Sequence, residues 1–284
     1  SPECTQELRA ITLDTRQATA TRVNAIRAAG NVHPIAEEAN KAVLDPNQQV
    51  AVTAAEHIRD NVKQDFEVTL ATCRKVKAWR PRAILLSSAM ADAIGQGNAD
   101  GRAKLVAYAD SLSNNAQAYE KGAIFLALGQ DQAQHERLLT KALQLEKVTS
   151  TYATEALVAY HDKNNSNDNK LWINQLRQLL RTGDPGLIAM TAEHLAGESA
   201  TSKIIQTQLK DVLFLDSALR NLTLPADIEA YNAVEKAIAA IQKKEFKPTK
   251  LEHEFPIDWA LVKRIPTAQT AEIHTNKGKI TIQL

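Results

Sequence analysis

Residues 184–195, DPGLIAMTAEHL, decide the fold class of this chain. Asp184 can cap the start of a helix, and Pro185 suits the first helical position, where no backbone N–H is needed. The apolar or small side chains that follow are spaced to share one face of a helix: Leu187, Thr191, Ala192 and Leu195. The stretch therefore predicts an amphipathic helix that buries one stripe.

The same pattern occurs earlier, in residues 44–58, LDPNQQVAVTAAEHI. Here Asp45 and Pro46 predict the cap and the first helical position, with two more residues after the proline than in the later copy. The matching stripe is Val50, Ala54, Ala55 and Ile58. Alignment of the two stretches pairs apolar with apolar residues and superposes AEH on AEH.

Six segments between the two copies each carry one apolar stripe and end near Gly, Asn, Asp or Pro. They are residues 63–79, 81–95, 99–112, 118–129, 135–147 and 149–161. Short amphipathic helices that cannot bury their stripes alone gain stability by stacking in pairs. These segments therefore predict a stack of helix pairs.

The shared pattern, Asp-Pro-x-(Val/Leu)-x-x-x-Ala-x-x-(Leu/Ile), resembles HEAT repeats over about residues 30–245, and residues 184–195 fit it best. We therefore expect an all-α fold, an irregular HEAT-like α-solenoid of antiparallel helix pairs, with a short β-hairpin at the C-terminus. The alternative is a helical bundle with two chance look-alike helices, because the repeat spacing is hard to follow through the middle of the chain.

Composition agrees with close-packed helices, since 45 of the 284 residues are alanine and only 5% are aromatic. The net charge of +1 lacks the basic excess of most nucleic-acid-binding surfaces, so nucleic acid is not the expected partner. No apolar run approaches the roughly 18–20 residues of a membrane span. We therefore expect protein or peptide partners and no membrane span.

The helical pattern stops near residue 245. The last long helix is expected in residues 225–244, with Pro225 at its start and one stripe formed by Ile228, Tyr231, Val234, Ile238 and Ile241. Pro248, Pro256 and Pro266 then exclude a long helix. A short turn over residues 258–265 is expected to hold Trp259 and Leu261 against the helical body.

The final residues, AEIHTNKGKITIQL (271–284), predict a hairpin. Two alternating strands, 271–275 and 279–284, flank the turn Asn276-Lys277-Gly278. An isolated two-stranded hairpin is marginal in water. Its inward side chains, Ile280, Ile282 and Leu284, therefore need a larger sheet.

This terminal stretch resembles the opening of a bacterial cyclophilin, a peptidyl-prolyl cis-trans isomerase whose barrel begins Thr-x-x-Gly-x-Ile-x-Ile-x-Leu. The matching residues are Thr275, Gly278, Ile280, Ile282 and Leu284. Helical repeats followed by PIDWALVKRIP and such a start resemble HEAT-repeat-containing bacterial isomerases. The resemblance implies three parts: a helical repeat domain (1–245), a Pro-containing linker (246–270) and the first hairpin of a truncated isomerase domain (271–284).

In that family the catalytic arginine and the aromatic-lined pocket follow the first two strands, so the resemblance assigns no catalytic residue to this chain. It implies an inactive fragment whose helices form a non-catalytic scaffold for protein or peptide clients, without a cofactor. It also implies an exported bacterial protein, periplasmic or membrane-anchored, although the residues themselves do not define the compartment. The alternatives are a HEAT-like nucleic-acid-binding protein and an enzyme with catalytic groups scattered through the helices.

The sequence offers no catalytic, cofactor-binding or metal site that we would assign. It contains no Gly-rich phosphate loop, Gly-x-Ser-x-Gly motif or Cys-His pairing, and Glu37 and Glu38 are too close in sequence to face each other across a pocket. Cys4 and Cys73 could form one disulfide, but we expect two buried or idle thiols. His57 and His194 occupy equivalent positions in the two matching helices, and we expect surface or capping histidines.

Two further segments contain residues of the kinds that bind a ligand. Residues 161–173, HDKNNSNDNKLWI, alternate oxygen donors as calcium loops do: Asp162, Asn164, Ser166 and Asp168, with Asn167 at the position of the turn. The twelfth position, however, is Ile173 instead of a bidentate carboxylate, so we expect an Asn-rich connection between helices.

The other segment is CRKVKAWRPR, residues 73–82. It places five basic residues around Trp79: Arg74, Lys75, Lys77, Arg80 and Arg82. Such a cluster could bind an acidic partner or a phosphate backbone. We expect a solvated helix end instead, because Lys and Arg are favoured at helix C-termini.

Overall fold

The computed structural model describes residues 1–164, 169–209, 211–250, 257–266 and 268–283. Residues 1–248 form one compact unit, and residues 249–284 form a second, smaller one. Each unit is described by itself. The first is helical and the second holds a two-stranded antiparallel hairpin, so the predicted all-α character and the terminal hairpin are both confirmed.

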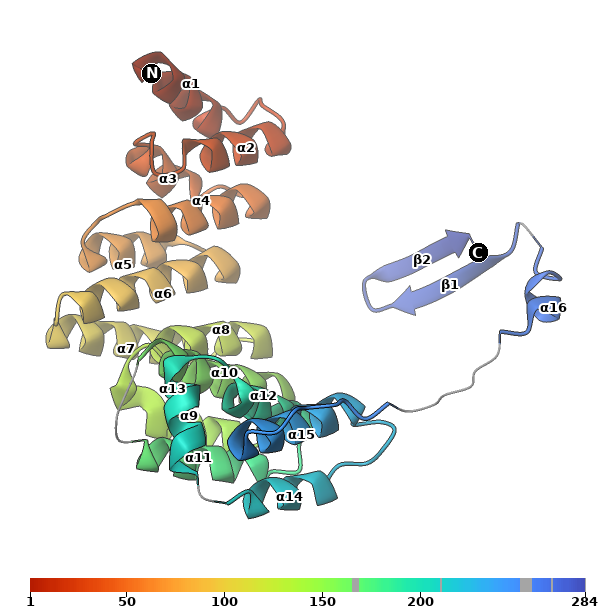
Figure 1. Ribbon diagram of the computed structural model, residues 1–284. Helices are drawn as coiled ribbons and strands as arrows, with labels where there is room; N and C mark the ends of the chain where they lie inside the picture. The colour runs from red at the N-terminus through yellow and green to blue at the C-terminus, as the bar shows by residue number, and fades with distance from the viewer. Residues whose placement is uncertain (165–168, 210, 251–256, 267, 284) are drawn as a thin grey trace. The chain divides into compact units, whose positions relative to one another are not determined.

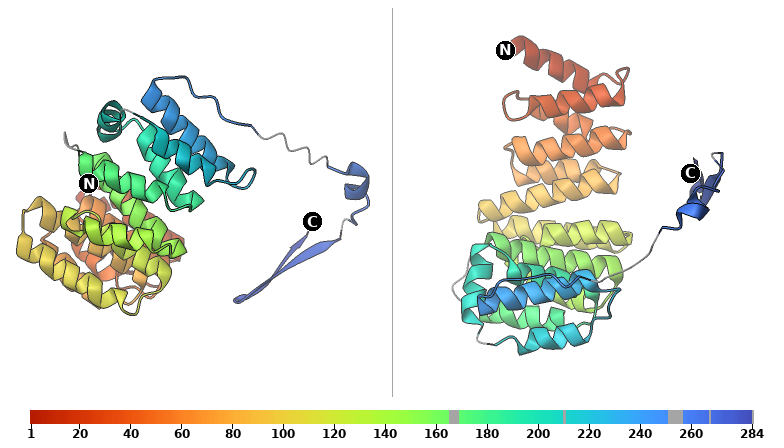
Figure 2. Two further views of the ribbon diagram at one scale, coloured as in Figure 1. Left: turned by 90° about the horizontal axis from the view of Figure 1, so that it is seen from below. Right: turned by 45° about the vertical axis from the view of Figure 1, so that its right-hand side comes forward.

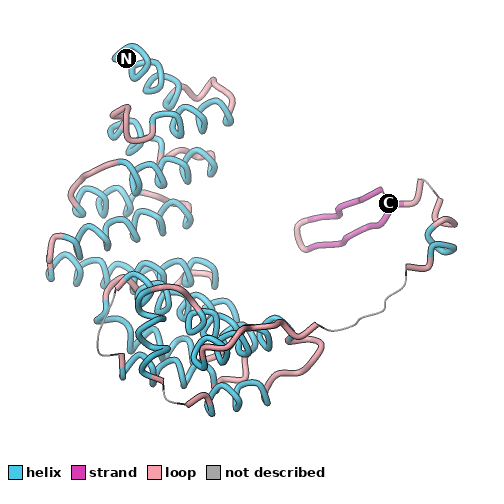
Figure 3. Tube along the Cα trace, viewed as in Figure 1, coloured by secondary structure: helices cyan, strands magenta, loops and turns pink. Residues whose placement is uncertain are grey.

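The helices of the first unit alternate with short loops along the chain (Figures 1 and 3). They are α1 (Pro2–Leu13), α2 (Thr19–Ala29), α3 (Ala36–Ala42), α4 (Gln48–Asn61), α5 (Phe66–Lys75), α6 (Trp79–Gly95), α7 (Ala99–Ser113), α8 (Ala118–Leu128), the short 3-10 helix η1 (Gln132–Gln134), α9 (His135–Leu143), α10 (Lys147–Lys163), α11 (Lys170–Leu180), α12 (Pro185–Ala196), α13 (Ala200–Gln208), α14 (Leu213–Arg220) and α15 (Ile228–Gln242).

Every second helix along the chain packs against the next member of the same series. The contacts run α2 to α4, α4 to α6, α6 to α8, α8 to α10 and α10 to α12, and we call these six helices the first row. The helices α3, α5, α7 and α9 pack beside them and form the second row. Figure 2 shows the successive layers of this unit from two further directions.

The ends of the first-row helices are regularly spaced along the chain, which was not apparent from the sequence alone. Its helices end at Ala29, Asn61, Gly95, Leu128, Lys163 and Ala196, so consecutive ends lie 32 to 35 residues apart. The apolar stripes alone hid this regularity, because the second-row helices vary from 7 residues in α3 to 15 in α7.

The two matching helices start differently. Helix α12 begins as predicted, with Pro185 at its first position and the Asp184 carboxylate accepting a hydrogen bond from the Leu187 N–H at 3.0 Å. Helix α4 does not begin at Asp45 and Pro46. Its cap is Asn47, whose side-chain oxygen accepts from the N–H groups of Gln49 and Val50.

Asp45 has another role, which explains the displaced start of α4. Its Oδ2 lies 2.5 Å from Nη2 of Arg22, and both side chains are more than nine-tenths buried. Its Oδ1 accepts a hydrogen bond from the Asn47 N–H at 2.7 Å. Asp45 therefore links α2 to the loop before α4, and the two extra residues after Pro46 carry the helix start beyond it.

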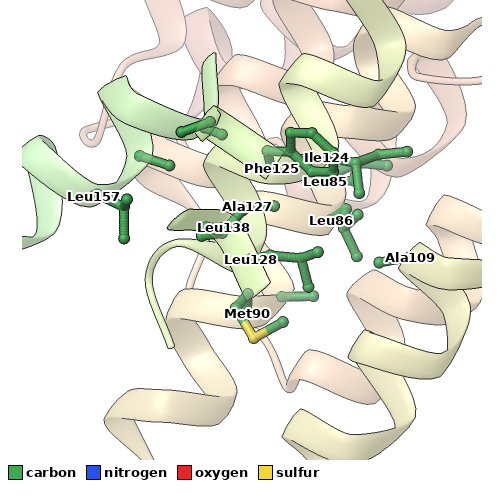
Figure 4. Close-up of a cluster of buried hydrophobic side chains, with 14 of the residues drawn as sticks. Leu85, Leu86, Met90, Ala109, Ile124, Phe125, Ala127, Leu128, Leu138 and Leu157 are labelled. Carbon is green, nitrogen blue, oxygen red and sulfur yellow. The ribbon is translucent and has the colours of Figure 1, made fainter. Parts of the chain in front are cut away.

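The predicted stripes lie in the core. Val50, Ala54, Ala55 and Ile58 of α4, and their counterparts Leu187, Thr191, Ala192 and Leu195 of α12, are all buried. The core continues through the middle of the unit, where side chains from α6, α7, α8, α9 and α10 meet (Figure 4). Burial of these side chains is the main stabilising contribution to the packing.

Helix α15 differs from its prediction. It begins at Ile228, three positions after Pro225, and its most buried side chains are Ala230, Ala233, Val234 and Ala237. Ile238 and Ile241 are only partly buried. Helix α15 packs against α12, and its small buried residues allow two helix backbones to approach closely.

The second unit contains the short helix α16 (Trp259–Val262) and the strands β1 (Thr270–Thr275) and β2 (Gly278–Gln283). The strands pair in antiparallel register, with Ile273 opposite Ile280 and Thr275 opposite Gly278. Gly278 has φ +137°, a conformation that suits glycine, and it starts the second strand one residue earlier than predicted. Trp259 and Leu261 are 61% and 58% exposed, and their packing against the helices stays a prediction.

The hairpin has one apolar and one polar face. Residues paired across an antiparallel ladder share a face, so Ala271, Ile273, Ile280 and Ile282 lie together. The three isoleucines are 44–53% exposed. The other face carries Glu272, which pairs with Lys279 at 2.6 Å and lies 3.4 Å from His274. Leu284, the third predicted inward residue, lies outside the described residues.

Candidate functional site

The two cysteines form no disulfide. Cys4 is an exposed free thiol in α1, with Sγ 4.0 Å from Nε2 of His33. Cys73 is a buried free thiol whose Sγ donates to the Arg82 carbonyl at 3.2 Å. Burial raises the pKa of Cys73 to about 11, so this thiol stays protonated and unreactive at neutral pH. Cys73 is therefore the buried, idle residue that we expected.

The prediction that His57 and His194 lie at the surface or cap helices is wrong. Both are buried, with 6% and 4% of their surface exposed. Burial lowers the pKa of His57, although Asp60 acts in the opposite direction. The AEH motif places each histidine on the buried side of its helix, one position before the last apolar residue of the stripe. The two histidines at these matching positions therefore share a packing role.

His194 lies in a hydrogen-bonded chain that connects three helices. Nε1 of Trp172 in α11 donates to Nε2 of His194 at 3.0 Å. Because an indole N–H can only donate, Nε2 is the acceptor and the proton of this neutral imidazole resides on Nδ1. Nδ1 therefore donates to Oδ1 of Asp162 in α10, 2.9 Å away. Both ring nitrogens are occupied, so His194 orients neighbouring groups and offers no lone pair to a substrate.

Three more aromatic side chains extend this chain, and we call the whole group the histidine cluster. His161 stacks on Trp172 with ring centroids 4.1 Å apart and planes 8° from parallel. Tyr160 and His135 meet edge to face at 4.4 Å. His135 also donates from Nε2 to the Gly129 carbonyl at 3.1 Å, since a carbonyl can only accept. The cluster thus joins α9, α10, α11 and α12.

The histidines of this cluster are neutral near pH 7. Burial lowers the pKa of His161 to about 3, with smaller effects from His135 and His194. Burial also lowers the pKa of His135, and it lowers that of His194 more than the Asp162 carboxylate raises it. The neutral rings contribute packing, and His194 and His135 also contribute the hydrogen bonds described above.

A cavity of about 920 Å³ lies beside the cluster, between α9, α10 and α11. Its wall includes His135, Tyr160, His161 and Trp172, together with amide side chains such as Gln175. Polar and aromatic groups of this kind can hold an uncharged ligand by stacking and hydrogen bonds.

The segment that resembled a calcium loop is partly engaged elsewhere. Asp162 lies in α10 and binds His194, and the Asn164 side chain donates to the Tyr160 carbonyl at 2.8 Å. Ser166, Asn167 and Asp168 lie outside the described residues, and Ile173 is in α11. Among the residues that the structure describes, no group of three or more His, Cys, Asp or Glu side chains could hold a metal ion.

The basic segment, residues 73–82, is divided between two helices. Arg74 and Lys75 are exposed in the last turn of α5, as expected for a solvated helix end. The Arg80 guanidinium lies 5.2 Å from the centroid of the Trp79 ring. Arg82 pairs with Glu120 and donates to the carbonyls of Val76 and Lys77. Its guanidinium is therefore engaged within the helical unit, whereas Arg74 and Lys75 are exposed.

A second hollow follows the C-terminal ends of the first-row helices. One section, about 600 Å³, is lined by residues of α6, α8 and α10 together with Arg59 of α4. The other, about 730 Å³, is lined by the ends of α4 and α6 and by Asn31 after α2. Arg59 and Asp92 line both sections, so we treat them as one feature and call it the helix-end groove.

Charges in the helix-end groove balance. Its basic residues are Arg59, Lys63 and Lys163, and its acidic residues are Asp60, Asp65 and Asp92. Arg59 and Asp60 pair with each other at 2.7 Å. A groove without net charge favours an uncharged ligand over a polyanion.

Known proteins offer no further guide to this site. No protein-family model, curated protein or solved structure matches this chain. Within the described part of the chain, every helix is too short or too polar to cross a membrane, as predicted.

Sequence reasoning missed the histidine cluster and the groove for different reasons. The cluster had a weak signal, since His161, Asp162 and Trp172 all fall within the segment examined for calcium ligands. The groove had a periodic signal, an amide residue near the end of each first-row helix from α2 to α10, but that period becomes visible only when the helix ends are known.

Proposed function

We propose that residues 1–245 form a HEAT-like α-solenoid of antiparallel helix pairs and act as a non-catalytic scaffold for protein or peptide clients. In this proposal the chain is the helical region of a cyclophilin-type peptidyl-prolyl cis-trans isomerase. The even 32–35-residue spacing of the first-row helix ends supports a repeat architecture. A repeat stack presents an extended binding surface because each layer contributes similar positions.

The helix-end groove is the observation that carries the proposal. It crosses the ends of five consecutive first-row helices and has no net charge. A long groove without net charge, lined by both polar and apolar groups, suits an extended protein segment better than a compact metabolite or a nucleic acid. The scaffold would raise the local concentration of such a segment near a linked catalytic domain.

The hairpin supports the isomerase part of the proposal. Ile273, Ile280 and Ile282 share one exposed face, and an exposed apolar sheet face requires a covering partner in a stable fold. We propose that further strands of a cyclophilin-like barrel provide that cover. If so, prolyl isomerase activity should appear in a protein that carries these residues together with any that its gene encodes after Leu284. Residues 1–284 alone should be inactive.

The scaffold itself is tested by binding. Reduced, carboxymethylated lactalbumin is permanently unfolded and serves as a client; its affinity for the chain would be measured by fluorescence anisotropy at 50 and 300 mM salt. We expect binding that changes little with salt, because the groove carries no net charge. Tight binding of a DNA duplex that weakens steeply with salt would instead favour the nucleic-acid alternative.

A further inference from the structure

A side-chain carboxamide stands at or just after the end of five first-row helices. In order along the chain they are Asn31, Asn61, Gln96, Gln130 and Asn164. They lie 30 to 35 residues apart, close to the 32 to 35 residues between helix ends. All five line the helix-end groove. One carboxamide per layer therefore follows the groove from α2 to α10.

A carboxamide recognises peptide groups without regard to sequence. Its oxygen accepts from a peptide N–H and its NH₂ donates to a peptide carbonyl. Two of the five are held in place by their own hydrogen bonds. Gln130 donates to the Ser87 carbonyl and hydroxyl at 3.1 and 2.8 Å, which uses both of its N–H groups and leaves its oxygen to accept from a peptide N–H. Asn164 donates one N–H to the Tyr160 carbonyl and keeps the other. Such fixed groups lose little entropy on binding.

The spacing of the layers selects one peptide conformation. Packed helices lie about 8–10 Å apart, so a ligand that meets one carboxamide per layer must repeat at about that distance. A polyproline II helix rises about 3.1 Å per residue and repeats every three residues, which gives about 9 Å per turn. In a β-strand the same face recurs every two residues, which is about 6.6–6.8 Å. A strand would therefore no longer align with the carboxamides after one layer.

The polyproline II backbone also needs such partners. It forms no internal hydrogen bonds, so its carbonyl and N–H groups are available along its whole length. A neutral groove matches it, because the charges of Arg59, Lys63 and Lys163 are balanced by three aspartates. Five carboxamides span four intervals, which corresponds to about 12 residues of such a peptide.

We propose that the helix-end groove binds a proline-containing peptide segment of about 12 residues in the polyproline II conformation, with one carboxamide bound to the backbone of each turn. The inference deepens the proposed scaffold function and rests on it, because it names the class of client segment. Prolines favour this conformation, and one residue in three needs to offer an N–H to a carboxamide oxygen. Its carbonyl can accept from the carboxamide NH₂ in every layer except that of Gln130, whose N–H groups are bonded to Ser87.

The probe is a fluorescein-labelled 12-residue peptide of repeating Pro-Pro-Ala, titrated with the full chain and followed by anisotropy. The comparison peptide is a repeating Gly-Ser chain of the same length and charge. We expect the Pro-Pro-Ala peptide to bind at least about ten-fold more tightly, because its backbone is already ordered.

The variant combines Asn31→Leu, Asn61→Leu and Gln96→Met, which remove three exposed carboxamides at similar volume. Loss of three backbone contacts should weaken Pro-Pro-Ala binding by at least about ten-fold. The matched control combines Asn114→Leu, Asn115→Leu and Asn221→Leu, exposed carboxamides at the ends of α7 and α14 that do not line the groove. It should bind as the parent does. Circular dichroism would verify that both variants fold.

The two proposals fail in different ways. If the Pro-Pro-Ala peptide binds no better than the Gly-Ser peptide, or if the groove variant binds it as tightly as the parent, the inference is overturned. Binding of unfolded lactalbumin by the parent would then leave the scaffold proposal standing. If neither peptide nor lactalbumin binds, both proposals are overturned.

Discussion

At the scale of single residues, buried polar groups in this protein find partners that are distant in sequence. Trp172 and His194 lie 22 positions apart, and Arg22 and Asp45 lie 23 apart. Each residue alone gave a misleading signal: His194 suggested a surface position and Asp45 suggested a helix cap. Local pattern could not predict these pairs, because the partner of a buried donor depends on which helices pack together.

The first prediction concerns Trp172. Trp172→Phe keeps an aromatic ring against His161 but removes the N–H that Nε2 of His194 accepts. A buried acceptor without a donor costs about 1–3 kcal/mol, and the smaller ring adds a cavity cost, so the free energy of unfolding should fall by at least that amount in urea titrations. Trp79→Phe is the control, since the partly buried Trp79 indole contacts the Arg80 guanidinium. Equal losses in the two variants would contradict the role of the hydrogen bond.

The second prediction concerns the buried ion pair. Arg22→Met leaves the Asp45 carboxylate buried without its cation, and breaking a buried pair in this way costs about 3–5 kcal/mol. Arg16→Met removes the partner of Asp14 in an exposed pair and should cost less than about 1 kcal/mol. Urea unfolding measures both. A loss for Arg22→Met as small as that for Arg16→Met would show that Asp45 is solvated in the folded chain.

At the scale of elements, the residues that form each helix were easier to predict than where it begins. Repeated apolar stripes identified α4, α6, α8, α10 and α12, because a stripe at helical spacing must be buried. Two starts were misplaced. Asn47 replaces Asp45 as the cap of α4 because Asp45 binds Arg22, and α15 begins three residues after Pro225. In both cases a tertiary contact or loop geometry overrides a valid local start signal.

Close contact between neighbouring helices gives the third prediction. Gly122 of α8 packs on Tyr152 of α10, and a Cβ at that position would lie 2.4 Å from the tyrosine ring. Gly122→Ala should therefore force the two helices apart and cost about 1–3 kcal/mol. Gly95, in the last turn of α6, has nothing within 4 Å of such a Cβ. Gly95→Ala should be neutral or stabilising by up to about 1 kcal/mol.

Thermal or urea unfolding of the two glycine variants provides the measurement. The same chemical change is made in both, so opposite effects isolate the contact between α8 and α10. If the Gly122→Ala variant were as stable as the Gly95→Ala variant, the inferred close contact between α8 and α10 would be contradicted.

At the scale of the whole molecule, stability should depend on pH through the buried histidines. Burial lowers the pKa values of His57, His135, His161 and His194 below that of an exposed histidine, about 6.5. Below pH 6.5 the unfolded chain therefore binds more protons than the folded chain, and stability falls as the pH falls. For His161 this loss continues towards pH 3, because its folded pKa is about 3.

The fourth prediction isolates one of these groups. His161→Phe keeps a ring on Trp172 but cannot be protonated. Between pH 6.5 and pH 5.5 a histidine that titrates only in the unfolded chain costs about 1 kcal/mol, so the variant should lose about that much less stability than the parent. If the stability of the parent and that of the His161→Phe variant depended on pH in the same way, the burial of a neutral His161 would be contradicted.

The proposed scaffold function depends on the helix-end groove, which could not be located from the sequence alone. The most direct test is hydrogen exchange of the full chain, alone and with an excess of reduced, carboxymethylated lactalbumin. We predict slower exchange in the last turns of α4, α6, α8 and α10, whose residues line the groove. Absence of binding, or slower exchange confined to α5, α7 and α9, would contradict the proposed scaffold.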